Sequence, residues 1–414
     1  MTTKEKLAID GGAPAKTVPY TKGIRFGKAE EEAAVACIRA QKLWYKQGGT
    51  RVTAVEKTIC EMHDIKHAVC CSSGTAAVHT ALAMCGVEAG DEVIVNPVSD
   101  WGSVCGILAL GAAPVFADID EETFSLDPAC VEAAVTDKTR AIMLVHLGGY
   151  PAHVREIIDL TKPRGIKVIE DCAQSPLTML DGQPVGTFGD VGAFSTNDSK
   201  HVSCGEGGFV ITRDDEMAHV ARLFIDKGYE RDRVRGCGDV RFLGFNYRLT
   251  ELQAAVLDVQ LRGLPAQLGK RRAYGERLIA GLEGIDGLKV MKVPPNAEGA
   301  YWFVLTHLEL EKLSADRSKV TEALTAEGLA CWGALAPAQT LYGTSAIRDG
   351  TLYPFRRTGR SAFPGGRKYP EGICPVAERI SDSAISLVCS PFYTRQDADE
   401  TAAGVRKVVD HYRK

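Results

Sequence analysis

Short apolar runs alternate with helical stretches through much of the chain, and this alternation constrains the fold more than any other feature. The runs have the length of buried strands: HAVCCSS, DEVIVNP, PVFADI, AIMLVHL, KVIEDC, GAFST and GFVIT. Helical stretches such as PAHVREIIDLTKPRG separate several of them. Apolar strands joined by helices are typical of a largely parallel sheet that is covered on both faces. The pattern predicts an α/β domain, with a locally antiparallel strand where GAFST and GGFVIT follow each other.

The length of 414 residues favours two domains with a terminal arm. The strand–helix rhythm ends at the helical region LTELQAAVLDVQLRGLPAQLGKRRAYGERLIAGLEG, which we expect to be broken at Pro265. AYWFVLTHLEL then resembles a strand, and SKVTEALTAEG and ADETAAGVRKVVDHYRK resemble helices. We predict an arm over residues 1–26, a large domain over 27–265 and a small C-terminal domain over 266–414.

Charge and composition argue against several classes of protein. The net charge is −4, from 49 basic and 53 acidic residues without a block of one sign, so we expect no nucleic-acid partner. No apolar run is long enough to span a bilayer and the start lacks an apolar signal core, so we expect no membrane association and a cytoplasmic location. The 13 scattered cysteines include no CxxC pair, which argues against a disulfide framework and against a metal site.

The segment CSSGTAAVHTALA predicts a strand that ends directly before a helix. Backbone N–H groups at a helix start lack partners and carry positive dipole character, so Gly74 and Thr75 are candidates for holding a phosphate. Glycine would also let a ligand approach the backbone closely. An ordinary serine or threonine helix cap is the alternative for this segment taken alone.

Two further segments contain the groups that pyridoxal phosphate chemistry needs. In KVIEDCAQS, Asp171 follows a buried strand and could pair with a pyridine nitrogen, and Gln174 could hydrogen-bond the ring oxygen. In GAFSTNDSKHVSCGEGG, Ser195 ends a strand and could donate to the phosphate. Lys200 follows on an irregular loop, where its amine could form a Schiff base with an aldehyde cofactor. Taken singly, Asp171 could be an acidic cap and Lys200 a solvated surface group.

Two other residues fall at strand ends. Trp101, in NPVSDWGSV, could stack on a cofactor ring or could be a core tryptophan. His146, in MLVHLGG, could line the pocket or could be a buried histidine with satisfied hydrogen bonds. The chain order is phosphate turn, aromatic residue, acid, serine and lysine, all at strand ends of one sheet. We therefore expect these groups to meet at one site.

The joint pattern resembles the DegT/StrS family of sugar and cyclitol aminotransferases, which have the aspartate-aminotransferase fold, fold type I of the PLP-dependent transferases. The resemblance covers most of the chain and includes these segments: LAIDGGAPA, SSGTAAVHTAL, GDEVIVNP, APVFADID, VHLGG, VIEDCAQS, GTFGDVGAFS, SKHVSCGEGG and GFNYRLTELQAA. It implies a large domain with a mostly parallel central sheet flanked by helices, a smaller C-terminal α+β domain, and pyridoxal 5'-phosphate as the cofactor.

The resemblance also implies roles around the cofactor ring. Lys200 would form the Schiff base and act in catalysis together with Asp171, which would pair with the ring nitrogen. Gln174 would bind the ring hydroxyl, and Trp101 would stack on the ring.

Other implied roles concern the phosphate. Gly74, Thr75 and Ser195 would hold it. In this family an asparagine of a GxNxR segment reaches the phosphate from the neighbouring subunit, and Asn246 in GFNYR matches that position. The resemblance therefore implies a homodimer with shared active sites.

The function that the resemblance implies is transfer of an amino group from L-glutamine or L-glutamate to a keto-cyclitol or keto-sugar, in aminoglycoside or amino-sugar biosynthesis. The LAIDGG opening and the GEGG turn look most like the cyclitol and aminoglycoside branch. A transaminase acting on a nucleotide-linked keto-sugar is one alternative. A PLP-binding regulatory protein without turnover is another, and the complete pair of Lys200 and Asp171 argues against it. Asp100 stands where a threonine is commoner, which weakens any transfer of substrate identity.

Overall fold

A computed structural model describes residues 5–414 of the chain except for 231–239, 241, 334–338, 350–351 and 354–365. Its main sheet has seven strands in the order β1-β9-β8-β5-β4-β2-β3. In that order the strands are β1 (His67–Cys71), β9 (Gly208–Thr212), β8 (Val191–Ser195), β5 (Lys167–Asp171), β4 (Thr139–Val145), β2 (Glu92–Val95) and β3 (Ala113–Phe116). The pairs from β8 to β3 are parallel, whereas β9 is antiparallel to both neighbours. The predicted parallel sheet and its antiparallel strand are both confirmed.

The C-terminal part of the chain forms a smaller antiparallel sheet with the order β10-β12-β14-β13. Its strands are β10 (Leu288–Val290), β12 (Phe303–Leu308), β14 (Ala384–Val388) and β13 (Cys331–Trp332). A third sheet of short strands contains β11 (Ala297–Glu298), β6 (Met179–Leu180) and β7 (Gln183–Pro184).

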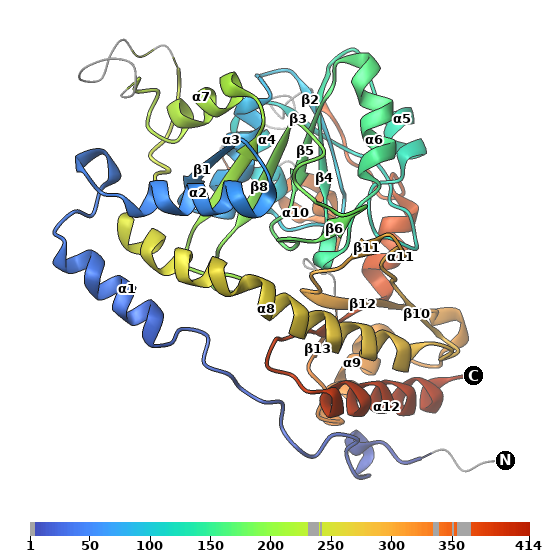
Figure 1. The fold of residues 1–414 in the computed structure, drawn as a ribbon. Helices are drawn as coiled ribbons and strands as arrows, with labels where there is room; N and C mark the ends of the chain where they lie inside the picture. The colour runs from blue at the N-terminus through green and yellow to red at the C-terminus, as the bar shows by residue number, and fades with distance from the viewer. Residues whose placement is uncertain (1–4, 231–239, 241, 334–338, 350–351, 354–365) are drawn as a thin grey trace.

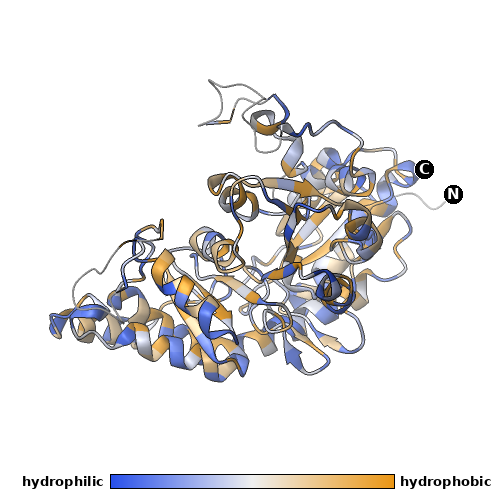
Figure 2. Ribbon diagram, turned by 90° about the horizontal axis from the view of Figure 1, so that it is seen from above, coloured by the Kyte–Doolittle hydropathy of each residue, from blue (hydrophilic) through white to orange (hydrophobic). Residues whose placement is uncertain are grey.

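Helices surround these sheets (Figure 1). They are α1 (Lys28–Arg39), α2 (Arg51–His63), α3 (Gly74–Met84), α4 (Gly102–Ala109), α5 (Pro128–Ala134), α6 (Val154–Thr161), α7 (Asp215–Phe224), α8 (Glu251–Leu282), α9 (Arg317–Ala326), α10 (Ser345–Arg348), α11 (Pro375–Ser383) and α12 (Arg395–Tyr412). Figure 2 shows hydrophobic residues along the main strands and mixed hydrophobic and hydrophilic residues on the helices around them.

Both faces of the main sheet are buried, which explains why its strands read as continuous apolar runs. Along β4, Ala141 and Met143 belong to one hydrophobic cluster, whereas Ile142 and Leu144 belong to another. Successive side chains of a strand point to opposite faces, so this alternation means that packed helices cover the two sides. No helix in the described part of the chain is long and apolar enough to cross a membrane.

Helix α8 continues through Pro265, so the prediction of a break at that residue is wrong. A proline in a helix interior costs about 3 kcal/mol or more because it removes a hydrogen bond and crowds the preceding turn. Leu261, Leu264 and Leu268 are buried on this stretch, and each such side chain contributes about 1.5–3 kcal/mol. Packing on both sides of the proline therefore outweighs its local cost.

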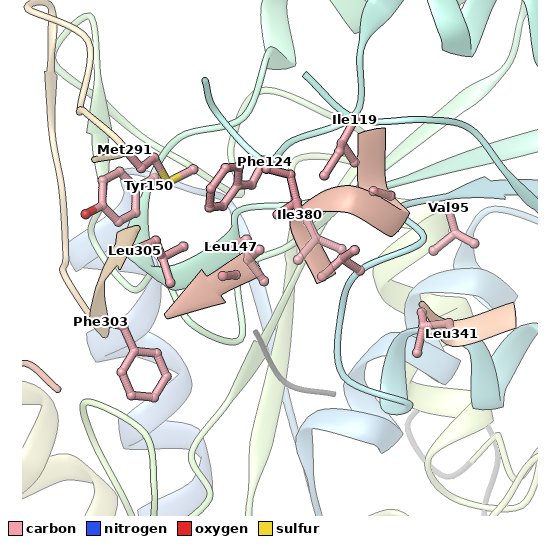
Figure 3. Close-up of a cluster of buried hydrophobic side chains, with 14 of the residues drawn as sticks. Val95, Ile119, Phe124, Leu147, Tyr150, Met291, Phe303, Leu305, Leu341 and Ile380 are labelled. Atoms are coloured by element: carbon pink, nitrogen blue, oxygen red, sulfur yellow. The ribbon is translucent and has the colours of Figure 1, made fainter. Parts of the chain in front are cut away.

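The main hydrophobic cluster extends from the large sheet into the C-terminal part. Figure 3 shows Val95 and Tyr150 from the first part of the chain in the same cluster as Met291, Leu305 and Ile380 from the second. A domain boundary near residue 265 stays a proposal, because it falls inside one helix and the two sides share buried side chains.

Candidate active site

A cavity of about 470 Å³ opens at the carboxyl ends of the parallel strands. Its lining residues include the ends of β4, β5 and β8 and the turn after β1. This edge is where open α/β sheets bind ligands. The cavity brings together the following residues that the sequence singled out: Gly74, Thr75, Asp171, Gln174, Ser195 and Lys200.

The turn before α3 is both a helix cap and part of the cavity wall. Ser73 caps the helix, since its hydroxyl accepts the Ala76 N–H at 3.0 Å. A Cβ atom on Gly74 would lie 2.6 Å from the Ser195 Cβ and 2.8 Å from its Oγ, so a side chain at Gly74 would fill this space. Thr75 also lines the cavity. Unpaired N–H groups at a helix start, with two nearby hydroxyls, form a cradle that fits a phosphate.

Asp171 ends strand β5 and is buried. The Ser103 hydroxyl donates to its Oδ2 at 2.8 Å and the Ala173 N–H donates to its Oδ1 at 3.1 Å. Burial raises the pKa of Asp171, and the two hydrogen bonds and the charge of Lys200 oppose that rise. A cationic ring nitrogen beside Asp171 would favour the ionised carboxylate, so this environment fits a protonated pyridine.

Gln174 follows Asp171 and is also buried. Its Oε1 accepts the Gly148 N–H at 2.7 Å. Because the amide oxygen is already held, the NH₂ group is the end of Gln174 that can meet a ligand oxygen in the cavity.

Lys200 lies on the loop after β8, where it is half-buried. Its Nζ is 3.8 Å from the centroid of the Trp302 ring, within the range of a cation–π contact. Burial lowers the pKa of Lys200, and the charges of Asp171 and Asp100 raise it. A lysine with a lowered pKa has a larger fraction of nucleophilic free amine, which suits attack on an aldehyde.

Two predicted site residues do not line the cavity. Trp101 directly precedes α4, where it is half-buried against the main hydrophobic cluster. Asn246 is exposed and pairs with Asp226 in an isolated β-bridge. The roles of Trp101 and Asn246 at the cofactor stay predictions.

His146 is a buried histidine whose two ring nitrogens are satisfied. Its Nε2 lies 2.9 Å from the Glu170 Oε2, and its Nδ1 accepts the Ala152 N–H at 3.0 Å. Together with Cys172 these side chains have the spacing of metal ligands. The Glu170 carboxylate also accepts N–H groups from Gly186, Phe188 and Gly189 at 2.7–2.8 Å. Those bonds already occupy the carboxylate, so the cluster supports a loop and is a poor metal site.

Several residues of the cavity were not found from the sequence. They are Ser99, Ser103, Asn197, Glu206, Trp302 and Trp332. Ser99 and Ser103 follow a predicted strand, and their hydroxyls lie 2.8 Å apart, so a polar pair at a strand end was the available signal. Trp302 and Trp332 come from the C-terminal part, and no local pattern connects them with the lysine segment.

Comparison with known proteins agrees with this geometry. Residues 26–406 match the model of the DegT/DnrJ/EryC1/StrS aminotransferase family. The chain is 37% identical over 423 residues to the L-glutamine:2-deoxy-scyllo-inosose aminotransferase of Streptomyces kanamyceticus, covering 98% of this chain and 97% of that protein. It is 34% identical over 370 residues to a UDP-N-acetyl-3-dehydro-alpha-D-glucosamine 3-aminotransferase of Acidithiobacillus ferrooxidans, covering 87% and 89%. The crystal structure of 3-amino-5-hydroxybenzoic acid synthase superposes with a TM-score of 0.84 at 25% identity, covering 96% and 100%.

Proposed function

This chain belongs to the DegT/DnrJ/EryC1/StrS aminotransferase family, and we propose that it transfers an amino group from L-glutamine or L-glutamate to a keto-cyclitol. It is a PLP-dependent aminotransferase. The observation that carries the proposal is the meeting of Lys200, Asp171 and the Gly74 turn in one cavity. That set supplies the amine, the carboxylate and the phosphate cradle that a transaminase needs.

The cofactor, when bound, supplies the electron sink and carries the amino group between donor and acceptor. Lys200 would hold the cofactor covalently and, once the donor has displaced it, would take the proton from the donor Cα and deliver it to the cofactor carbon that had carried the aldehyde. Asp171 would remain ionised and stabilise positive charge on the ring nitrogen. Gln174 would fix the ring orientation through its NH₂ group, and the Gly74 turn would bind the phosphate.

The remaining lining of the cavity supports a polyhydroxylated ring as the acceptor. Trp302 and Trp332 present rigid indoles, and the carboxylates of Asp100 and Glu206 can accept hydrogen bonds from hydroxyl groups. The name of the kanamyceticus relative, L-glutamine:2-deoxy-scyllo-inosose aminotransferase, supports a cyclitol. The second candidate is a nucleotide-linked keto-sugar, which the name of the Acidithiobacillus relative supports.

We further propose a homodimer in which Asn246 reaches the phosphate of the neighbouring subunit. Asn246 is exposed and outside the cavity of its own chain. Apolar side chains are also exposed on the arm and on α1: Ile24 is 84% exposed and Ile38 is 50% exposed. Exposed apolar side chains on the arm and on the helix that follows it support a surface that another chain covers.

The proposal is tested by following the two half-reactions separately. L-Glutamine or L-glutamate should convert the yellow cofactor band to that of the aminated form, and a keto-cyclitol should restore it. Borohydride reduction before the donor is added should attach the cofactor to Lys200, and Lys200→Ala is the matched control without that adduct. Restoration by nucleotide keto-sugars alone would favour the second candidate. No response to any amino-acid donor would contradict both.

A further inference from the structure

Side chains from distant segments hold the backbone of the lysine loop. The Arg25 guanidinium donates to the carbonyl oxygens of both Asp198 and Lys200. The Trp302 Nε1–H donates to the carbonyl oxygen of Ser199 at 3.0 Å. Three successive carbonyls of the loop are therefore bound, two by the N-terminal arm and one by the residue that precedes β12.

The arm is fixed to the C-terminal part before it reaches the loop. The buried Glu327 carboxylate accepts the N–H groups of Ala8 and Ala15 at 2.8 and 2.7 Å. The Lys16 ammonium is buried, and it pairs with Asp397 at 2.5 Å. In Figure 1 the arm passes α12 on its way to α1. The chain that leads to Arg25 is thus anchored by buried charged groups.

The arm is fixed beyond Arg25 as well. The amide of Gln260, on α8, donates to the Arg25 carbonyl oxygen at 3.1 Å and to the Glu30 carboxylate at 2.6 Å. Gln260 is buried, so these bonds are protected from solvent. Arg25 therefore reaches the loop from a backbone that is held on both sides.

We propose that Arg25 and Trp302 are positioning residues, which hold the loop so that the Lys200 amine is placed for its reaction with the cofactor aldehyde. In that reaction the amine nitrogen bonds to the aldehyde carbon and the aldehyde oxygen leaves as water. This inference rests on the proposed role of Lys200. The ring of Trp302 contacts the amine itself, and its N–H holds the preceding residue, so one side chain fixes both ends of the lysine.

The chemistry of the two side chains suits this task. A guanidinium is a planar fork with several donors, so it can bind two carbonyls at once, whereas a lysine ammonium cannot reproduce that geometry. Without the hydrogen bonds from Arg25 and Trp302, the loop would expose Lys200 to water. Since burial is the main cause of its lowered pKa, exposure would raise the pKa again. The charged groups that act on Lys200, Asp171 and Asp100, are not touched by changes at Arg25 or Trp302.

The experiment compares three variants in the full chain. Arg25→Ala removes the fork, Arg25→Lys keeps the charge without the fork, and Trp302→Phe keeps a ring under the amine but removes the N–H donor. Lys28→Ala is the matched control, because Lys28 is a nearby exposed cation whose ion pair among the described residues is with Glu32, at 3.6 Å. The first measurement is the pH dependence of Lys200 acetylation in cofactor-free protein, read by peptide mass spectrometry. The second is the rate at which added PLP forms the yellow band.

We expect acetylation of Lys200 to need a higher pH in Arg25→Ala and Trp302→Phe than in wild type. PLP should react about ten- to a hundredfold more slowly in Arg25→Ala, the range expected when a reacting group is displaced by about 1 Å. Arg25→Lys should recover only part of the loss, and Lys28→Ala should match wild type. If Arg25→Ala does not fold, Trp302→Phe decides the question.

The inference would be overturned if Arg25→Ala and Trp302→Phe showed the wild-type pH dependence of acetylation and the wild-type rate of reaction with PLP. An equal change in Lys28→Ala would also overturn it. Failure of the proposed role of Lys200 would look different. In that case borohydride would attach the cofactor of the wild-type protein to another lysine, whatever the result for the Arg25 and Trp302 variants.

Discussion

The hydroxyl of Ser103 should set the acid limit of activity through Asp171. Among the residues that the structure describes, Ser103 supplies one of two hydrogen bonds to Asp171, and this bond opposes the rise in pKa that burial causes. A hydrogen bond to a charged group is worth about 1.5–3 kcal/mol, so Ser103→Ala removes about that much stabilisation from the carboxylate. Since 1.4 kcal/mol corresponds to about tenfold in rate, the donor half-reaction should slow by about ten- to a hundredfold.

The sign of the pH effect follows from the direction of the pKa. The variant raises the pKa of Asp171 further, so the carboxylate becomes protonated at a higher pH than in wild type, and the acid side of the kcat/KM profile should move to higher pH. Stopped-flow absorbance of the donor half-reaction measures this limb. Ser99→Ala is the matched control, because Ser99 contacts the Ser103 hydroxyl, and it should cause a smaller change. An acid limb in Ser103→Ala that coincides with wild type would refute the reasoning.

Asp171→Asn keeps the size of the side chain and removes its charge, so the fold should persist by circular dichroism while the proton shift slows about tenfold for each 1.4 kcal/mol lost. Near-normal turnover would contradict the role of the carboxylate. Gly74→Ala would place a methyl group 2.6 Å from the Ser195 Cβ, so PLP affinity by equilibrium dialysis should fall, and an unchanged affinity would argue against the phosphate cradle. Mixing Lys200→Ala chains with Asn246→Ala chains should restore some activity after subunit exchange, because each hybrid dimer would hold one complete site. Failure to complement in chains that do exchange would mean that Asn246 acts within its own subunit.

Most of the fold could be predicted because hydrophobic periodicity reports burial directly. The runs around Val69 and Ile142 are apolar at successive positions, which is the pattern of a sheet covered on both faces. The prediction of a helix break at Pro265 was wrong because it relied on a local signal alone. Proline is a local signal, whereas the continuity of α8 depends on leucines that pack against segments far away in the sequence.

The candidate site shows the same contrast between local sequence signals and tertiary contacts. Lys200, Asp171 and Gly74 each follow a strand end, and parallel strands bring their carboxyl ends to one edge, so their meeting could be predicted. Their roles stay predictions. Arg25 and Trp302 could not be found, because each contacts the lysine loop through a tertiary arrangement that leaves no periodic trace in the sequence.

The adjacent acids of β5 serve opposite faces of one sheet. Asp171 faces the cavity, while Glu170 ties His146 and the loop at 186–189 together on the other side. Because side chains alternate along a strand, a register shift of one residue would exchange the two acids. The cavity would then lose the Asp171 carboxylate, and the loop at 186–189 would lose its hydrogen bonds to Glu170. Strand register here is therefore under two independent constraints. Directed evolution toward new acceptors therefore has little freedom at this dipeptide. Substitutions near Trp302 and Trp332, which line the cavity, are better starting points.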